Sequence, residues 1–119
     1  TSVRIGERGA RPDFIIGDRF GTSASREMSS VAICMLQTQG FVVSQNKPYA
    51  GGFITEHYGR PAHRLHALQI EVNRGLYVCE NSFAKLDGYT ALKVAIDFFL
   101  TSFNAYVAGS LQPNALAAE

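Results

Sequence analysis

Short apolar runs and one helical repeat organise the first half of the chain. The run "DFIIGD" (13–18) is bounded by Asp and Gly, which is typical of a fully buried strand. "FVVSQN" (41–46) predicts a second strand, and the segment 47–64, with its Gly and Pro residues, predicts a long loop. Between the two strands, apolar residues recur at the spacing of one helix face until Gly40: Met28, Val31, Ala32, Met35 and Leu36.

The segment "HALQIEVN" (66–73) predicts a third strand, with one acid inside an apolar run. Strand alternation puts Gln69 and Glu71 on one face, together with Ala67 and Asn73, and His66, Leu68 and Ile70 on the other. A buried carboxylate without a partner is costly. Glu71 is therefore either catalytic or paired with Arg74 or Arg64 in a structural salt bridge, and the pattern leaves both readings open.

The order of elements predicts an α/β fold in a single domain, residues 1–119. A short helical turn near Ser82 precedes a long amphipathic helix, marked by Leu92, Ile96, Phe99, Phe103 and Tyr106, and 110–119 reads as a flexible tail. The sequence β-α-β-loop-β-α favours parallel strands with helical cover. Ligands bind such sheets beyond the carboxyl ends of the strands, where we expect Asp18, Asn46 and Glu71 to lie together.

Composition and charge narrow the class of protein. The chain has 119 residues, 46% of them hydrophobic, and a net charge of +1, which argues against several domains and against binding to nucleic acid or an anionic membrane surface. No apolar run approaches a membrane span. Eight of the eleven basic residues are Arg, whose planar guanidinium matches carboxylates, so a small anionic substrate is plausible. Cys34 and Cys79 show no ligand spacing and indicate reduced thiols in a cytoplasmic protein.

Other candidate chemistry in the chain is weak. The three His residues, His57, His63 and His66, lack the spacing of a metal site. Ser23 and Ser25 lie in "GTSAS", where helix capping explains them better than nucleophilic catalysis. Pro48, Gly51 and Gly52 predict a turn from which Asn46 and Tyr49 can project, and Gly and Pro hold Arg60 on a stiff backbone in the long loop. These side chains could point toward a ligand or belong to an ordinary surface loop.

Three joined motifs give a specific resemblance: "RPDFIIGDRFGTS", "NKPYAGGFITEHYGRP" and "HALQIEVNRGLY". Together, over about residues 11–82, they resemble the C-terminal half of the N-formylglutamate amidohydrolase (N-formylglutamate deformylase) family. The resemblance implies a three-layer, mostly parallel sheet with helices on its faces, similar to phosphorylases and zinc peptidases, of which this chain would be only a part. It also implies a cytoplasmic enzyme of histidine degradation that hydrolyses N-formyl-L-glutamate to formate and L-glutamate.

The resemblance also implies roles for individual residues. Zinc is expected in the full-length enzyme, with ligands mostly outside this chain, so we assign no metal ligand here. Glu71 is expected to act as general base toward a zinc-bound water. Arg60 is the first choice for binding the substrate carboxylates and Arg74 the second, with Asn46 and Tyr49 completing the pocket.

Two other functions stay open. The chain could belong to an amidase or carboxypeptidase of the zinc-peptidase class that acts on peptides, or it could be a non-catalytic fragment that binds a small carboxylate or a partner chain. The start without Met suggests a fragment. A small sheet also leaves a strand edge exposed, which predicts pairing with a missing N-terminal half or with a second copy of the chain.

Overall fold

The computed structural model describes residues 11–78 and 88–110. Eight elements follow one another along the chain: β1 (Phe14–Gly17), α1 (Arg26–Thr38), β2 (Val43–Gln45), α2 (Phe53–Tyr58), η1 (Pro61–His63), β3 (Gln69–Val72), η2 (Arg74–Leu76) and α3 (Gly88–Ser110). The three predicted strands and both predicted long helices are confirmed. The expected turn near Ser82 lies outside the described residues, as does the expected tail beyond Ser110, which itself ends α3.

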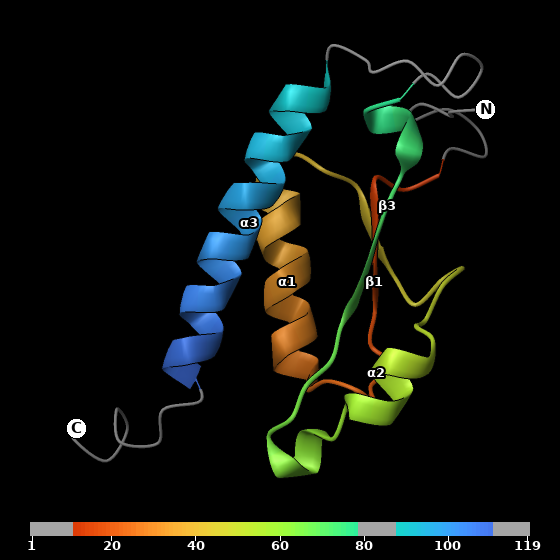
Figure 1. The fold of residues 1–119 in the computed structure, drawn as a ribbon, viewed down its shortest axis with the longest axis vertical. Coiled ribbons are helices and arrows are strands. Elements are labelled where there is room, and N and C mark those ends of the chain that lie inside the picture. Colours follow the sequence, from red (N-terminus) through yellow and green to blue (C-terminus); the bar gives the residue numbers. More distant parts are fainter. Residues whose placement is uncertain (1–10, 79–87, 111–119) are drawn as a thin grey trace.

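The sheet is mixed, with the strand order β2-β1-β3 (Figure 1). β1 runs parallel to β2, with Phe14 opposite Val43, but antiparallel to β3, with Ile15 opposite Glu71 and Gly17 opposite Gln69. The expectation of parallel strands was therefore wrong for β3. In consequence Glu71 does not share the carboxyl edge of the sheet with Asp18 and Asn46.

The segment between β2 and β3 explains this direction. A parallel connection needs a crossover that carries the chain back along the sheet, usually as an α-helix. Here the predicted loop instead contains the six-residue α2 and the three-residue η1, both too short to cross back. The backbone N–H of Ala67 then donates to the carbonyl of Ser23, at 2.8 Å, which ties the entry of β3 to the segment that leaves β1. β3 therefore starts beside the carboxyl end of β1 and runs in the opposite direction.

Both long helices lie on the same side of the sheet (Figure 1). Ser25 caps α1 by accepting a hydrogen bond from the N–H of Met28, as the sequence predicted for the hydroxyl residues before the helix. The core between β1, α1 and α3 consists of Phe14, Ile16, Ala32, Leu36, Leu92 and Phe99. The third layer expected of this fold is not seen among the described residues.

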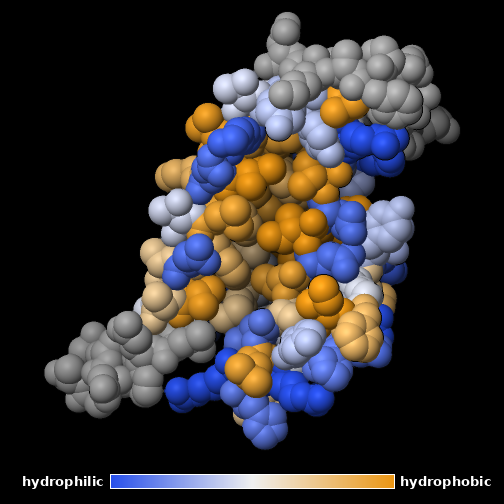
Figure 2. Space-filling view, in the orientation of Figure 1, coloured by the Kyte–Doolittle hydropathy of each residue, from blue (hydrophilic) through white to orange (hydrophobic). Residues whose placement is uncertain are grey.

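The helix α3 differs from the expectation that no apolar run is long enough to span a membrane. It has 23 residues, and by length and composition alone it could cross a membrane, although this is weak evidence for a single helix. Figure 2 shows apolar side chains gathered where this helix meets the sheet. They surround a hollow of about 250 Å³, lined by residues that include Val72, Leu92 and Ile96.

Candidate functional site

A cavity of about 520 Å³ brings together three segments that are distant in sequence. They are the start of β1, the loop after β2, and the end of β3 with η2. The polar and aromatic side chains of its lining include Arg11, Tyr49, Glu71, Arg74 and Tyr77, and Ile15 contributes apolar surface. A cavity with an apolar wall and a few charged groups is the usual form of a small-molecule site.

Three of the predicted site residues line this cavity: Tyr49, Glu71 and Arg74. Glu71 is half-buried in the middle of β3. Its Oε1 accepts a hydrogen bond from Nε2 of Gln69 at 2.7 Å, which agrees with the prediction that these two side chains share a face. Arg74 begins η2, whose start is capped by Asn73 Oδ1 accepting from the N–H of Gly75 at 2.9 Å.

Two predicted site residues lie elsewhere. Asn46 and Arg60 are not part of the lining of this cavity. The Asn46 side chain binds Asp18 through both of its polar atoms, and Arg60 forms an isolated bridge with Leu65 at an exposed position. These contacts of the two residues are with Asp18 and Leu65 and not with Glu71.

The Asp18 carboxylate is the centre of the polar contacts at the carboxyl end of β1. Asp18 is only 1% exposed. Its Oδ2 accepts from Ser29 Oγ at 2.7 Å and from Gln45 Nε2 at 3.0 Å, and its Oδ1 accepts from Asn46 Nδ2 at 2.8 Å and from the N–H of Gly21 at 2.9 Å. Burial alone would raise the pKa of Asp18, but these four hydrogen bonds outweigh it and hold that pKa below its usual value.

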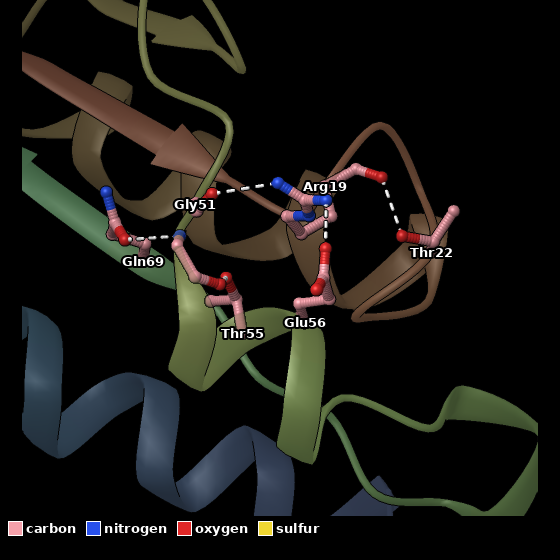
Figure 3. Close-up of polar contacts among 7 residues, drawn as sticks. Arg19, Thr22, Gly51, Thr55, Glu56 and Gln69 are labelled. Atoms are coloured by element: carbon pink, nitrogen blue, oxygen red, sulfur yellow. Dashed lines mark hydrogen bonds and ion pairs between the residues drawn. The ribbon is translucent and has the colours of Figure 1, made fainter.

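A second group of contacts fixes the loop that carries Tyr49. Figure 3 shows Arg19 reaching over this loop, where its guanidinium donates to the Gly51 carbonyl at 3.1 Å and pairs with the Glu56 carboxylate. Gly17 approaches the same loop so closely that an added Cβ would lie 2.6 Å from the Ala50 oxygen. The loop is therefore held against the end of β1.

The His and Ser residues have structural contacts. His66 Nδ1 accepts from the N–H of Ser25 at 3.0 Å, and Ser23 Oγ donates to the Ala67 carbonyl at 2.8 Å. The His57 ring stacks on Phe53 with 5.0 Å between ring centroids. Within residues 11–78 and 88–110, no group of three or more His, Cys, Asp or Glu side chains could hold a metal ion.

Sequence reasoning missed two features of this region. Arg11 lines the cavity, but in the sequence it is only the first residue of the motif "RPDFIIGDRFGTS" and was given no role. Asp18 was expected at a strand end but not as an acceptor of four hydrogen bonds. A signal for the second was available, because an Asp that ends a buried strand and precedes Gly and hydroxyl residues is suited to accept local hydrogen bonds.

The chain is similar in sequence to known proteins. Residues 1–78 match the family model described as N-formylglutamate amidohydrolase. The chain is 33% identical over 76 residues to an N-formylglutamate deformylase of Pseudomonas aeruginosa, and 35% identical over 74 residues to one of Pseudomonas putida. These matches cover 62% and 60% of this chain but only 28% and 27% of the two relatives.

A solved structure shows the same fold. The crystal structure of N-formylglutamate amidohydrolase from Ralstonia eutropha JMP134 superposes with a TM-score of 0.82 at 28% sequence identity. The superposition covers 92% of this chain and 38% of that one, so the chain spans well under half the length of these relatives. With the family model matching well over half of its residues, the chain belongs to the N-formylglutamate amidohydrolase family.

Proposed function

We propose that this chain takes part in hydrolysing the formamide C–N bond of N-formyl-L-glutamate, which yields formate and L-glutamate, with Glu71 as the general base. The observation that carries the proposal is the cavity in which Glu71 lies with Tyr49 and Arg74, in a chain of this family. Glu71 is half-buried, and a carboxylate at such a place can accept a proton from water that attacks the formyl carbon. It can then deliver that proton to the departing amine.

The charges of the cavity suit the proposed substrate. N-formyl-L-glutamate carries two carboxylates, and two arginines, Arg11 and Arg74, are among the residues that line the cavity. Arg binds carboxylates through two parallel hydrogen bonds, which fixes their orientation as well as their position. Because Arg60 lies outside the cavity, the geometry favours Arg74 over Arg60 as the residue that binds a substrate carboxylate.

We propose zinc only for a complete enzyme. By complete enzyme we mean a protein that contains these 119 residues and also the part of the relatives' length that the 119 residues do not match. The described residues offer no set of ligands for a metal ion. Any ligands would have to come from outside them, and the role proposed for Glu71 uses only its own carboxylate. A cytoplasmic location likewise stays a prediction.

Formate release tests the proposed function. We expect the 119 residues alone to release no formate from N-formyl-L-glutamate, because they cover only about 28% of a deformylase relative. The complete enzyme should release it at a rate that depends on a chelatable metal. Chelator-sensitive formate release by the 119 residues alone would contradict the first expectation. No release by the complete enzyme would favour a binding role instead.

Substitution of the two candidate arginines tests substrate binding. We expect Arg74→Lys in the complete enzyme to raise KM for N-formyl-L-glutamate by about 10-fold or more, because Lys cannot form the paired hydrogen bonds of a guanidinium. Arg60→Lys should change KM little. A formamide without carboxylates should be hydrolysed equally well by all three proteins. A larger effect at Arg60 than at Arg74 would show that the cavity is not where the carboxylates bind.

A further inference from the structure

We propose that Gln69 is a positioning residue, which aligns the Glu71 carboxylate and couples it to the loop that carries Tyr49. The inference rests on the proposed role of Glu71. It concerns a side chain that neither the motifs nor the family comparison assigns to the site. Gln69 is half-buried on β3, and it contacts Glu71 on one side and the loop on the other.

The contacts of Gln69 form a short relay. Its Nε2 donates to Glu71 Oε1 at 2.7 Å, and its Oε1 accepts from the backbone N–H of Gly52 at 3.1 Å. Alternation along the strand places Gln69 and Glu71 two residues apart on one face, which is why one amide can reach the carboxylate directly. Every polar atom of the amide is thereby directed at a specific partner.

The Gly52 N–H fixes which way the amide points. A backbone N–H can only donate, so it requires the oxygen of the Gln69 amide, and the NH₂ group must then face Glu71. Figure 3 shows this orientation, with the Gln69 oxygen toward the loop and its nitrogen on the opposite side. Rotating the amide by half a turn would bring two donors together at Gly52 and an oxygen against the carboxylate of Glu71.

Gly52 can serve as a reference point because the loop before it is anchored to β1. The N–H of Arg19 donates to the Ala50 carbonyl at 2.8 Å, and the Arg19 guanidinium donates to the Gly51 carbonyl at 3.1 Å. The close approach of Gly17 to Ala50 leaves no room for the loop to move toward the strand. Tyr49 immediately precedes these anchored residues. The relay therefore links the positions of Tyr49 and Glu71, which both line the cavity.

This arrangement has a consequence for the proposed reaction. Gln69 occupies Oε1 of Glu71, so the proton from the attacking water would be received at Oε2. A carboxylate held by one oxygen loses rotational freedom, and the second oxygen keeps a fixed direction relative to the substrate. Errors of position near 1 Å can cost about 100-fold in rate, so such alignment has a measurable effect.

Three variants of the complete enzyme distinguish the contact of Gln69 with Glu71 from its contact with Gly52. Gln69→Glu keeps an acceptor for the Gly52 N–H but replaces the donor to Glu71 with a second carboxylate, which repels the Glu71 carboxylate or shares a proton with it. The alignment of Glu71 is then lost, so kcat should fall by about 10- to 100-fold with little change in KM. Gln69→Leu removes both contacts, so KM should rise as well because the loop after Tyr49 loses its link to β3 at Gly52. Ile70→Val is the matched control, since Ile70 lies on the same strand and the opposite face, and it should leave both constants near those of the unsubstituted enzyme.

Two results would overturn the proposal. One is an unchanged kcat in both Gln69 variants, while Glu71→Gln still abolishes turnover; this would leave the proposed function intact and remove only the role of Gln69. The other is an equal loss in Ile70→Val, which would assign the effect to the packing of β3.

A structural readout keeps the inference testable even if the enzyme acts on another substrate. Amide hydrogen exchange at Gly52 should be faster in Gln69→Leu than in the unsubstituted protein and unchanged in Gln69→Glu. The ¹³C resonance of the Glu71 carboxyl carbon should shift in both variants. Unchanged exchange at Gly52 in Gln69→Leu, or an unchanged Glu71 resonance in both variants, would refute the relay whether or not formate is released.

Discussion

Glu71→Gln in the complete enzyme is expected to lower kcat for formate release by about 10²- to 10⁴-fold, the usual loss when a general base is removed. The amide has nearly the shape of the carboxylate and keeps an oxygen that can accept from Gln69. It cannot take a proton from water at neutral pH. The free energy of unfolding, the KM and the metal content should therefore change little while turnover is lost, which steady-state kinetics and urea unfolding can measure together.

A matched control shows whether the effect belongs to the cavity. Glu27→Gln makes the same chemical change at an exposed position on α1, where the carboxylate accepts a hydrogen bond from Tyr106. It should leave kcat unchanged. If Glu71→Gln kept nearly full turnover, or lost stability and turnover together, Glu71 would be the structural salt-bridge partner that the sequence pattern also allowed.

The elements of the fold were largely predictable from local patterns. The β1 run is apolar at every interior position and is buried along its whole length, and the apolar spacing before Gly40 corresponds to α1. The direction of β3 was not predictable in this way. The direction depends on the path of the segment that contains α2 and η1, which brings the chain to the carboxyl end of β1 before β3 begins. The sequence of a long loop with scattered Gly and Pro does not indicate whether the loop crosses the sheet.

The candidate site was predictable only in part, for the same reason. An acid inside an apolar strand marked Glu71, and its placement in a cavity with Tyr49 and Arg74 supports that interpretation. Asn46 was grouped with Glu71 because all three strands were expected to end at one edge, and Arg60 was added because Gly and Pro hold it on a stiff backbone in the loop after Asn46. Once β3 runs antiparallel, Glu71 lies toward the start of β1, whereas Asn46 stays at the end of β1, bound to Asp18. The local sequence pattern does not show at which end of the sheet each of these residues lies.

Asp18→Ala is expected to lower the free energy of unfolding by about 3–5 kcal/mol. Removing the carboxylate leaves several donors at a buried site without their acceptor, and each unsatisfied group costs about 1–3 kcal/mol. Asp18→Asn should recover little of this loss, because its NH₂ group would face amide nitrogens that can only donate, either Gln45 Nε2 or Asn46 Nδ2. Asp97→Asn is the control, since Asp97 forms an exposed pair with Lys93 on α3 and should change stability by only a few tenths of a kcal/mol. A change below about 1 kcal/mol for Asp18→Ala would show that these hydrogen bonds do not stabilise the fold.

The pH dependence of unfolding provides a second measure of the same contacts. The native pKa of Asp18 lies below the value of 3.8 that the unfolded chain is expected to show. At a pH between these two values the unfolded state binds the proton more readily, so acid shifts the equilibrium toward unfolding. The stabilisation from Asp18 is therefore complete above 3.8 and is lost as the pH falls through that value toward the lower native pKa. Urea unfolding at a series of pH values can measure this loss. Below about pH 4 the free energy of unfolding should fall more steeply in the unsubstituted protein than in Asp18→Ala. Parallel curves would mean that the four donors do not hold Asp18 ionised.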